Sequence, residues 1–193
     1  MITDGKGSNR VLRKDAHRRR ERLLRAALEL HASEGFDISL EKIADRAKVG
    51  RTTLYRNFPD RGALVAAVLE MQLKEVAAQV EEWGDRTDAF LLGVRALANL
   101  TIASGGFSKI VSMDRWAPSV SGGFRIGVEK ILAKPLESAK AAGLVRADFH
   151  ISDVHLAALM VAGGGLDKRG SNPKASIDRA MQLLASALRP QVP

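Results

Sequence analysis

Residues 39–64 read SLEKIADRAKVGRTTLYRNFPDRGAL, and this stretch contains two short amphipathic segments separated by a tight turn. Ser39 is a good N-cap for a helix over about 40–48, and Val49-Gly50 interrupts the helical pattern. A second short helix is expected over about 51–57. The apolar residues expected to face inward are Leu40, Ile43, Ala44, Ala47, Leu54 and Phe58. Two short helices joined in this way after a longer helix predict a helix-turn-helix.

The second short helix presents polar side chains on the face opposite Leu54 and Phe58. Arg51, Thr52, Tyr55 and Arg56 form that outer face, and Thr53 and Asn57 flank it. A recognition helix needs such a face because it enters the major groove while its inner face packs on the other helices. Arginine, threonine and asparagine can bond base edges, and tyrosine and arginine can also bond phosphates. We therefore expect this helix to bind DNA.

These residues resemble the DNA-binding domain of TetR/AcrR-type transcriptional repressors. The resemblance covers residues 18–70 and rests on the 39–64 stretch, with Ala26–Leu30 and Glu34–Phe36 matching the family's first helix. It implies an all-α homodimer in which each subunit has an N-terminal DNA-binding domain and a larger C-terminal domain for ligand sensing and dimerisation. It also implies a double-stranded palindromic DNA operator as partner, and a small-molecule effector that releases the repressor from it.

The resemblance also assigns roles to individual positions. Arg51 and Thr52 hold groove-entering positions, whereas Tyr55, Asn57 and Arg61 hold phosphate-contacting positions. At the start of the second helix the backbone amides approach the DNA backbone. The full set of predicted DNA-binding residues adds Arg18 on the first helix, Ser39 and Leu40 at the start of the second, and Thr53 and Arg56 on the third.

The turn departs from the family's usual Gly-Val-Ser, because it reads Lys48-Val49-Gly50. Lys48 lies where a positive φ is often required, so we expect a strained or reshaped turn. Gly50 lacks the hydroxyl that would cap the recognition helix, which costs roughly a few tenths of a kcal/mol. Asn57 stands where a histidine is common. These differences leave DNA binding expected and leave the individual base contacts open.

Positive charge is concentrated in the first third of the chain. The formal charge is +8, and residues 1–61 hold 15 basic and 9 acidic side chains. We expect residues 1–14 to be a flexible basic arm that reaches a minor groove on DNA. After this arm we expect a DNA-binding domain over residues 15–62 and then a ligand-sensing and dimerisation domain over residues 63–193. The same charge also suits an alternative, a basic helical protein that coats the nucleoid or a membrane surface with little sequence preference.

The rest of the chain is also expected to be helical, because apolar residues recur at three- and four-residue intervals and strand patterns are absent. The expected helices cover about 87–103, 107–113, 119–142, 151–167 and 173–188. Residues 151–162 and 177–188 are the most apolar late segments, and in the family the last two helices pair across the dimer. The alternative is an ordinary core within one chain.

An apolar ligand pocket in the C-terminal half is a further expectation. Its predicted lining is Phe90, Leu97, Phe107, Met113, Trp116, Phe124, His155 and Met160. His155 or Arg95 would provide a polar contact. Aromatic side chains at helical spacing also occur as simple core residues, and that reading stays open for each of them.

Several other classes of protein are disfavoured by the sequence. There is no cysteine, so disulfides, cysteine-ligated metals and a cysteine nucleophile are excluded. The chain contains no GxSxG, HExxH, Walker A or GxGxxG motif, and we expect neither an enzyme nor a metal or cofactor. No apolar stretch reaches the length of a membrane span, and the N-terminus has no apolar signal region. We therefore expect a cytoplasmic protein without a membrane partner.

Overall fold

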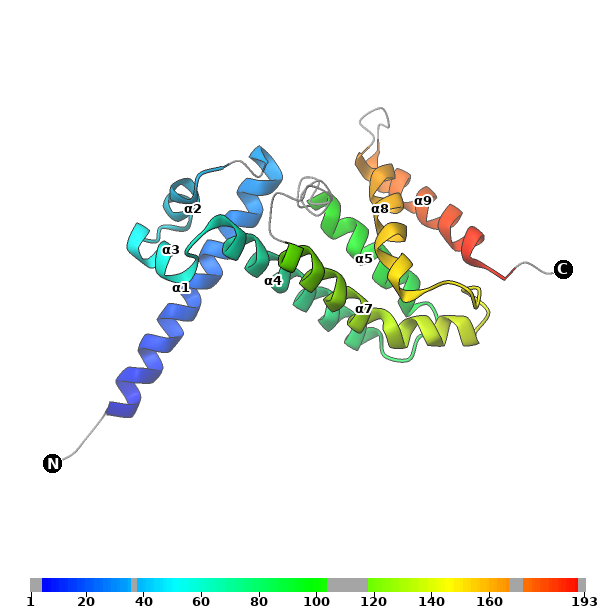
Figure 1. Ribbon diagram of the computed structural model, residues 1–193, viewed down its shortest axis with the longest axis horizontal. Coiled ribbons are helices and arrows are strands. Elements are labelled where there is room, and N and C mark those ends of the chain that lie inside the picture. The colour runs from blue at the N-terminus through cyan, green and yellow to red at the C-terminus, as the bar shows by residue number, and fades with distance from the viewer. Residues whose placement is uncertain (1–4, 36–37, 104–117, 167–171, 191–193) are drawn as a thin grey trace. The chain divides into compact units, whose positions relative to one another are not determined.

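The computed structural model describes residues 5–35, 38–103, 118–166 and 172–190, and within these ranges every regular element is a helix (Figure 1). The all-α fold class is thereby confirmed. The chain divides into two compact units, Met1–Val68 and Leu69–Pro193.

The first unit contains three helices and the beginning of a fourth: α1 (Gly5–Glu34), α2 (Leu40–Ala47), α3 (Arg51–Asn57) and the first two turns of α4 (Arg61–Trp83). Its core is made of apolar side chains from all four helices, including Leu23, Ala27, Ile43, Leu54, Phe58 and Leu64. Gly35 has φ +87°, and its N–H donates to the His31 carbonyl, so it ends α1 as a left-handed C′ residue. The three-helix arrangement expected for a helix-turn-helix is present.

The beginning of α1 and the end of the unit differ from the sequence-based expectation. Residues 5–14 were expected to belong to a flexible arm, but they continue α1. Extending a formed helix costs little for the lysines, arginines and leucine of this segment, because the unfavourable step is nucleation. The unit also extends to Val68 instead of residue 62, since Leu64, Val65 and Val68 are buried in the first turns of α4.

The turn between α2 and α3 has the predicted left-handed residue. Lys48 has φ 55° and ψ 47°, and its N–H donates to the Asp45 carbonyl at 3.1 Å. The Val49 N–H donates to the Ala44 carbonyl at 2.9 Å, which closes the end of α2. Gly50 is the N-cap of α3 and provides no side-chain cap, as its lack of a side chain requires.

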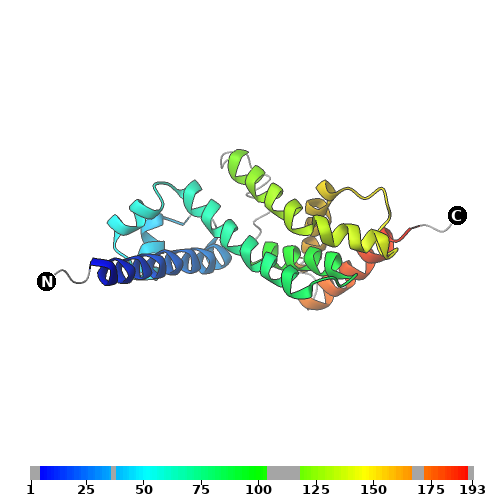
Figure 2. The ribbon, with the colours of Figure 1, turned by 90° about the horizontal axis from the view of Figure 1, so that it is seen from below.

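The second unit contains the remainder of α4 together with α5 (Ala89–Ala103), α7 (Pro118–Ala141), a 3₁₀ turn η1 (Ile151–Asp153), α8 (Val154–Leu166) and α9 (Pro173–Leu188). α8 packs against both α5 and α9, and these helices lie side by side in Figures 1 and 2. Phe90, Val94, Leu132, Leu136 and Val145 form the centre of the core. The helix expected over 107–113 lies outside the described residues.

Two further observations concern the whole of the described chain. No helix in the described ranges is both long and apolar enough to cross a membrane. Within the same ranges, no group of three or more histidine, aspartate or glutamate side chains is placed to hold a metal ion.

Candidate nucleic-acid interface

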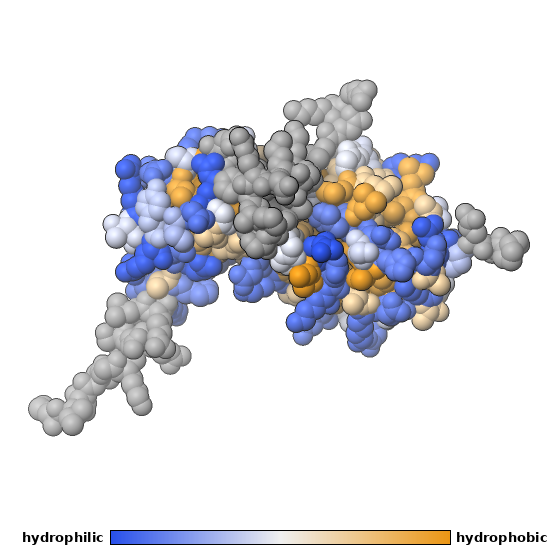
Figure 3. All heavy atoms as spheres, in the orientation of Figure 1, coloured by the Kyte–Doolittle hydropathy of each residue, from blue (hydrophilic) through white to orange (hydrophobic). Residues whose placement is uncertain are grey.

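The outer face of α3 is the best-defined polar surface of the first unit. Arg51, Thr52, Tyr55 and Arg56 are exposed, whereas Leu54 and Phe58 are 0% and 1% exposed. The polar residues predicted for the outer face of α3 are therefore exposed, and the apolar residues predicted for its inner face are buried. Figure 3 shows that the described surface of this unit is largely hydrophilic. A short helix fixed on its apolar side with arginine and threonine side chains free on the other can present these groups to a groove.

Ser39 and Leu40 lie at the start of α2, as expected. The Ser39 Oγ accepts a hydrogen bond from the Lys42 N–H at 3.2 Å, so Ser39 is the N-cap of this helix. Leu40 is half-buried. The first turn of α2 is therefore held at its N-cap.

Tyr55 joins α3 to α2 through an exposed hydrogen bond. Its hydroxyl donates to Glu41 Oε1 at 2.5 Å, and its side chain remains 44% exposed. This bond lowers the pKa of the Glu41 carboxyl below its usual value. The same bond raises the pKa of the Tyr55 hydroxyl. Sequence reasoning did not identify Glu41, because nothing in its spacing from Tyr55 indicates that the two side chains meet.

Asn57 and Arg61, both predicted phosphate contacts, have partners inside the unit. Asn57 Nδ2 donates to the Thr53 carbonyl at 2.7 Å, and Arg61 Nη2 donates to the Ile38 carbonyl at 2.7 Å. The positive charge of Arg61 also affects the protonation of His31, a buried residue near the end of α1. Burial, aided by the positive charge of Arg61, lowers the pKa of His31 to about 4. Arg61 therefore has a structural role in addition to any contact with phosphate.

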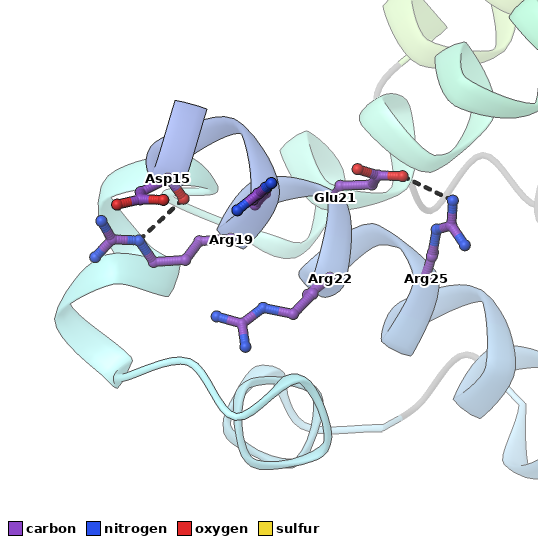
Figure 4. A pocket seen from close by; sticks show the side chains of 6 residues that line it. Asp15, Arg19, Glu21, Arg22 and Arg25 are labelled. Atoms are coloured by element: carbon purple, nitrogen blue, oxygen red, sulfur yellow. Dashed lines mark hydrogen bonds and ion pairs between the residues drawn. The ribbon is translucent and has the colours of Figure 1, made fainter. Parts of the chain in front are cut away.

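Arginines of α1 line a surface groove of about 700 Å³ (Figure 4). Its lining residues are Asp15, Arg18, Arg19, Glu21, Arg22 and Arg25. Arg19 Nε donates to the Asp15 carbonyl at 3.1 Å, and Arg25 pairs with Glu21 at 2.7 Å. Arg18 and Arg22 are exposed and have no ion-pair partner in the part of the chain that the structure describes. The groove can therefore bind anions through two guanidinium groups.

The predicted ligand-binding residues fall into three groups in the second unit. Phe90, Leu97 and Phe124 are buried, and Phe124 meets His155 edge to face with ring centroids 6.3 Å apart. Met160 is 63% exposed, so it lies outside the buried core of this unit, and its part in a ligand site stays a prediction. The sequence could not predict this outward position. The helix α8 is apolar around most of its circumference, so its periodicity gives no inward direction. Phe107, Met113 and Trp116 lie outside the described residues.

Polar groups near this core are also paired. Arg95 bonds Asp178 at 2.5 Å and so connects α5 to α9. Burial lowers the pKa of His155, and the positive charge of Arg125 adds to this effect. His155 is therefore neutral near pH 7 and can both donate and accept a hydrogen bond.

An all-helical chain with a capped α2, a tight left-handed turn and an exposed polar α3 is a helix-turn-helix protein. Comparison with known proteins finds similarity to one family of regulators. The family model described as bacterial regulatory proteins, tetR family, matches residues 23–68. An uncharacterized HTH-type transcriptional regulator of Mycobacterium tuberculosis is 35% identical over 79 residues, which are 40% of this chain and 42% of the relative. The match thus spans less than half of the length of that curated relative.

Solved structures extend the similarity over nearly the whole chain. A TetR transcription regulatory protein from Mycobacterium vanbaalenii has a TM-score of 0.65 and 26% identity, covering 93% of this chain and 99% of the other. The TetR transcriptional regulator SCO0520 from Streptomyces coelicolor has a TM-score of 0.61 and 28% identity, covering 90% and 99%. The chain is therefore similar to TetR-family transcriptional regulators: residues 23–68 match the family model, and the solved structures share the fold of nearly the whole chain.

Proposed function

We propose that the protein is a sequence-specific DNA-binding regulator that acts as a homodimer, represses transcription and is released from its operator by a small molecule. The observation that carries this proposal is the exposed polar face of α3, fixed by the buried side chains Leu54 and Phe58. This arrangement meets the requirement for a helix that enters the major groove. The match of residues 23–68 to a family of bacterial regulatory proteins, and the similarity to a solved TetR regulator, support it.

Base reading is proposed for the beginning of α3. Arg51 and Thr52 are exposed there and can bond base edges, arginine most favourably to guanine. Thr53 is half-buried and Arg56 is exposed, so Thr53 lies at the edge of this surface and Arg56 on it. Each good bidentate contact discriminates against a wrong base by about 1–3 kcal/mol.

Phosphate contacts are proposed around this helix. The internal bonds of Asn57 and Arg61 are compatible with them, because an amide has a second N–H and a guanidinium has five donors. Ser39 and Leu40 would place the first amides of α2 against the backbone, and Arg18 would add a contact from the basic groove of α1. Together these contacts would provide the part of the affinity that depends on salt.

Dimerisation is proposed through α8 and α9. Leu156 and Met160 of α8 and Leu183 of α9 are exposed, and Figure 3 shows hydrophobic surface over this part of the second unit. Exposed apolar residues gathered on neighbouring helices mark an interaction surface. A twofold dimer would place two recognition helices on successive half-sites and thereby read a palindromic operator.

Release by a ligand is proposed to involve the core around Phe124 and His155. A neutral, half-buried histidine against an aromatic ring combines an apolar wall with a hydrogen-bonding group, which is typical of small-molecule sites. A ligand that binds the DNA-incompetent arrangement more tightly shifts the dimer off its operator.

The proposal is tested by selection of duplexes from a randomised pool with the full chain. A repressor enriches one palindromic motif. The alternative, sequence-tolerant binding of the nucleoid or a membrane surface, is favoured by the positive charge of residues 1–61 and by the exposed guanidinium groups of Arg18 and Arg22. It predicts no enriched motif and equal competition by random duplex. In that case anionic vesicles would distinguish binding of nucleic acid from binding of membrane.

A further inference from the structure

The first turn of α2 carries an acidic residue on the surface proposed to face DNA. Glu41 lies two residues after the N-cap Ser39, and its carboxylate accepts a hydrogen bond from the Tyr55 hydroxyl at 2.5 Å. Arg51 acts electrostatically on both side chains. The three groups therefore form one exposed cluster that joins α2 to the recognition helix.

Tyrosine has one hydroxyl proton to donate, and this fixes what the cluster can do. In the DNA-free chain that proton is donated to Glu41. A phosphate oxygen approaching Tyr55 needs the same proton, so the two acceptors exclude each other. A glutamate is ordinarily ionised at neutral pH, and the bond with Tyr55 favours the ionised form of Glu41 further by lowering its pKa. A phosphate that takes the hydroxyl therefore meets a second negative charge beside it.

We propose that Glu41 limits the DNA affinity of this surface by competing with a backbone phosphate for the Tyr55 hydroxyl. The inference rests on the proposed function and names a residue that acts against binding. Binding to DNA requires the Tyr55–Glu41 bond to open, and Glu41 also offsets part of the positive charge of Arg51. Because phosphates are common to all sequences, the effect is the same on operator and non-operator duplexes.

The chain provides a direct readout of this bond without DNA. Tyr55 is the only tyrosine in the sequence, so ultraviolet titration of the phenolate reports its pKa alone. The bond to Glu41 is the main cause of the raised pKa of Tyr55. Replacement by the neutral isostere, Glu41→Gln, is expected to lower the pKa of Tyr55 towards its usual value. An unchanged titration would overturn the inference before any DNA is added.

The DNA experiment uses the full chain, the duplex enriched by the wild-type protein and a scrambled duplex of equal length. Glu41→Gln is expected to tighten binding to both duplexes by about three- to tenfold, with a larger gain at low salt. Glu29→Gln is the matched control. It removes the same charge from an exposed glutamate of the same unit, which pairs with Arg46 instead of Tyr55, and its effect should stay within about twofold.

A cycle with Tyr55→Phe separates competition from simple repulsion. If the two acceptors compete for one proton, most of the gain from Glu41→Gln disappears when the hydroxyl is absent. An equal gain in both backgrounds would mean charge repulsion alone, and weaker binding by Glu41→Gln would mean that Glu41 positions Tyr55. A change on the enriched duplex only would mean a base contact. Each of these results overturns the inference.

Failure of the inference can be told apart from failure of the proposed function. A wild-type protein that enriches no duplex contradicts the proposed function, and the inference falls with it. A wild-type protein that binds its enriched duplex while Glu41→Gln gains nothing contradicts the inference alone. Circular dichroism melting of each variant confirms that the comparison is made between folded chains.

Discussion

The guanidinium of Arg20 lies over the ring of Phe58, with its Cζ 4.7 Å from the ring centroid. This contact joins α1 to the residue that ends α3, and Phe58 is 1% exposed. Arg20 thus differs from its neighbours Arg18 and Arg22, which line the outward groove of the same helix. A cation over an aromatic face is stabilising, and here it fixes the end of the proposed recognition helix.

Replacement of Arg20 is expected to loosen α3. Arg20→Ala should lower the free energy of opening of the α3 amides by about 1 kcal/mol, because it removes the cation–π contact and the packed arginine stem. Native-state hydrogen exchange measures this locally. Arg22 lies two residues after Arg20 on the exposed side of α1. Arg22→Ala should change the free energy of opening of the α3 amides by less than about 0.5 kcal/mol. Equal effects of the two variants would show that the contact with Phe58 contributes nothing.

Among the residues that the structure describes, Lys48 is the one non-glycine residue with a positive φ. Its replacement tests whether the turn is strained. Lys48→Gly should raise the free energy of unfolding by about 0.5–1 kcal/mol, because glycine adopts this conformation without a steric penalty. Lys48→Val should lower it by about 1 kcal/mol, since a β-branched residue is disfavoured there. Urea denaturation followed by circular dichroism measures both. The charge control is Lys48→Ala, and a gain from alanine equal to that from glycine would rule out strain as the cause.

The helix-turn-helix could be predicted from sequence because its signals are local. Ser39 caps α2, Gly35 ends α1 and Lys48 adopts the left-handed conformation, and each follows from residues within one or two turns. The start of α1 was misplaced because charged residues are compatible with both a helix and a solvated arm. The caps and the turn, in contrast, could be predicted without knowledge of tertiary packing.

The missed parts of the candidate site depend on contacts between elements. The Tyr55–Glu41 bond joins residues 14 positions apart on different helices, and the Arg61 bond to the Ile38 carbonyl joins residues 23 positions apart. The exposure of Met160 could not be predicted, because α8 is apolar on nearly all sides. Periodicity identifies a face only when polar residues mark the opposite one.

Protonation of His31 should couple the stability of the first unit to pH. His31 is 2% exposed, and its pKa is lowered to about 4 from an ordinary value of 6.5. As pH falls, the unfolded chain binds this proton first, so the contribution of the neutral side chain is complete above pH 6.5 and is lost towards pH 4. The free energy of unfolding should fall by up to about 1.4 kcal/mol per pH unit in this interval.

Urea denaturation of the wild type and of His31→Gln between pH 7 and pH 4 isolates this contribution. The variant should be less stable at pH 7 and should show a shallower slope. His17→Gln, which replaces an exposed histidine on the same helix, should keep the wild-type slope. A wild-type slope in His31→Gln would contradict the assignment.

The exposed apolar residues of α8 and α9 predict the oligomeric state. Leu156→Glu combined with Leu183→Glu should convert a dimer to a monomer in analytical ultracentrifugation at micromolar concentration, because charges are costly in an apolar interface. Ile126→Glu is the control, since Ile126 is 62% exposed on α7, outside these helices. The surface assignment fails if the double variant stays dimeric or if the control dissociates equally.

The proposed function requires the exposed face of α3 to read base sequence. The most direct test is the ratio of affinities for the enriched duplex and a scrambled duplex of equal length, measured for the wild type and for Arg51→Ala with Thr52→Ala. The wild type should prefer the enriched duplex by about a thousandfold or more. The variant should lose about 1–3 kcal/mol of that preference per half-site while its affinity for the scrambled duplex falls less. An unchanged ratio in the variant, or a wild-type ratio near one, would contradict the account.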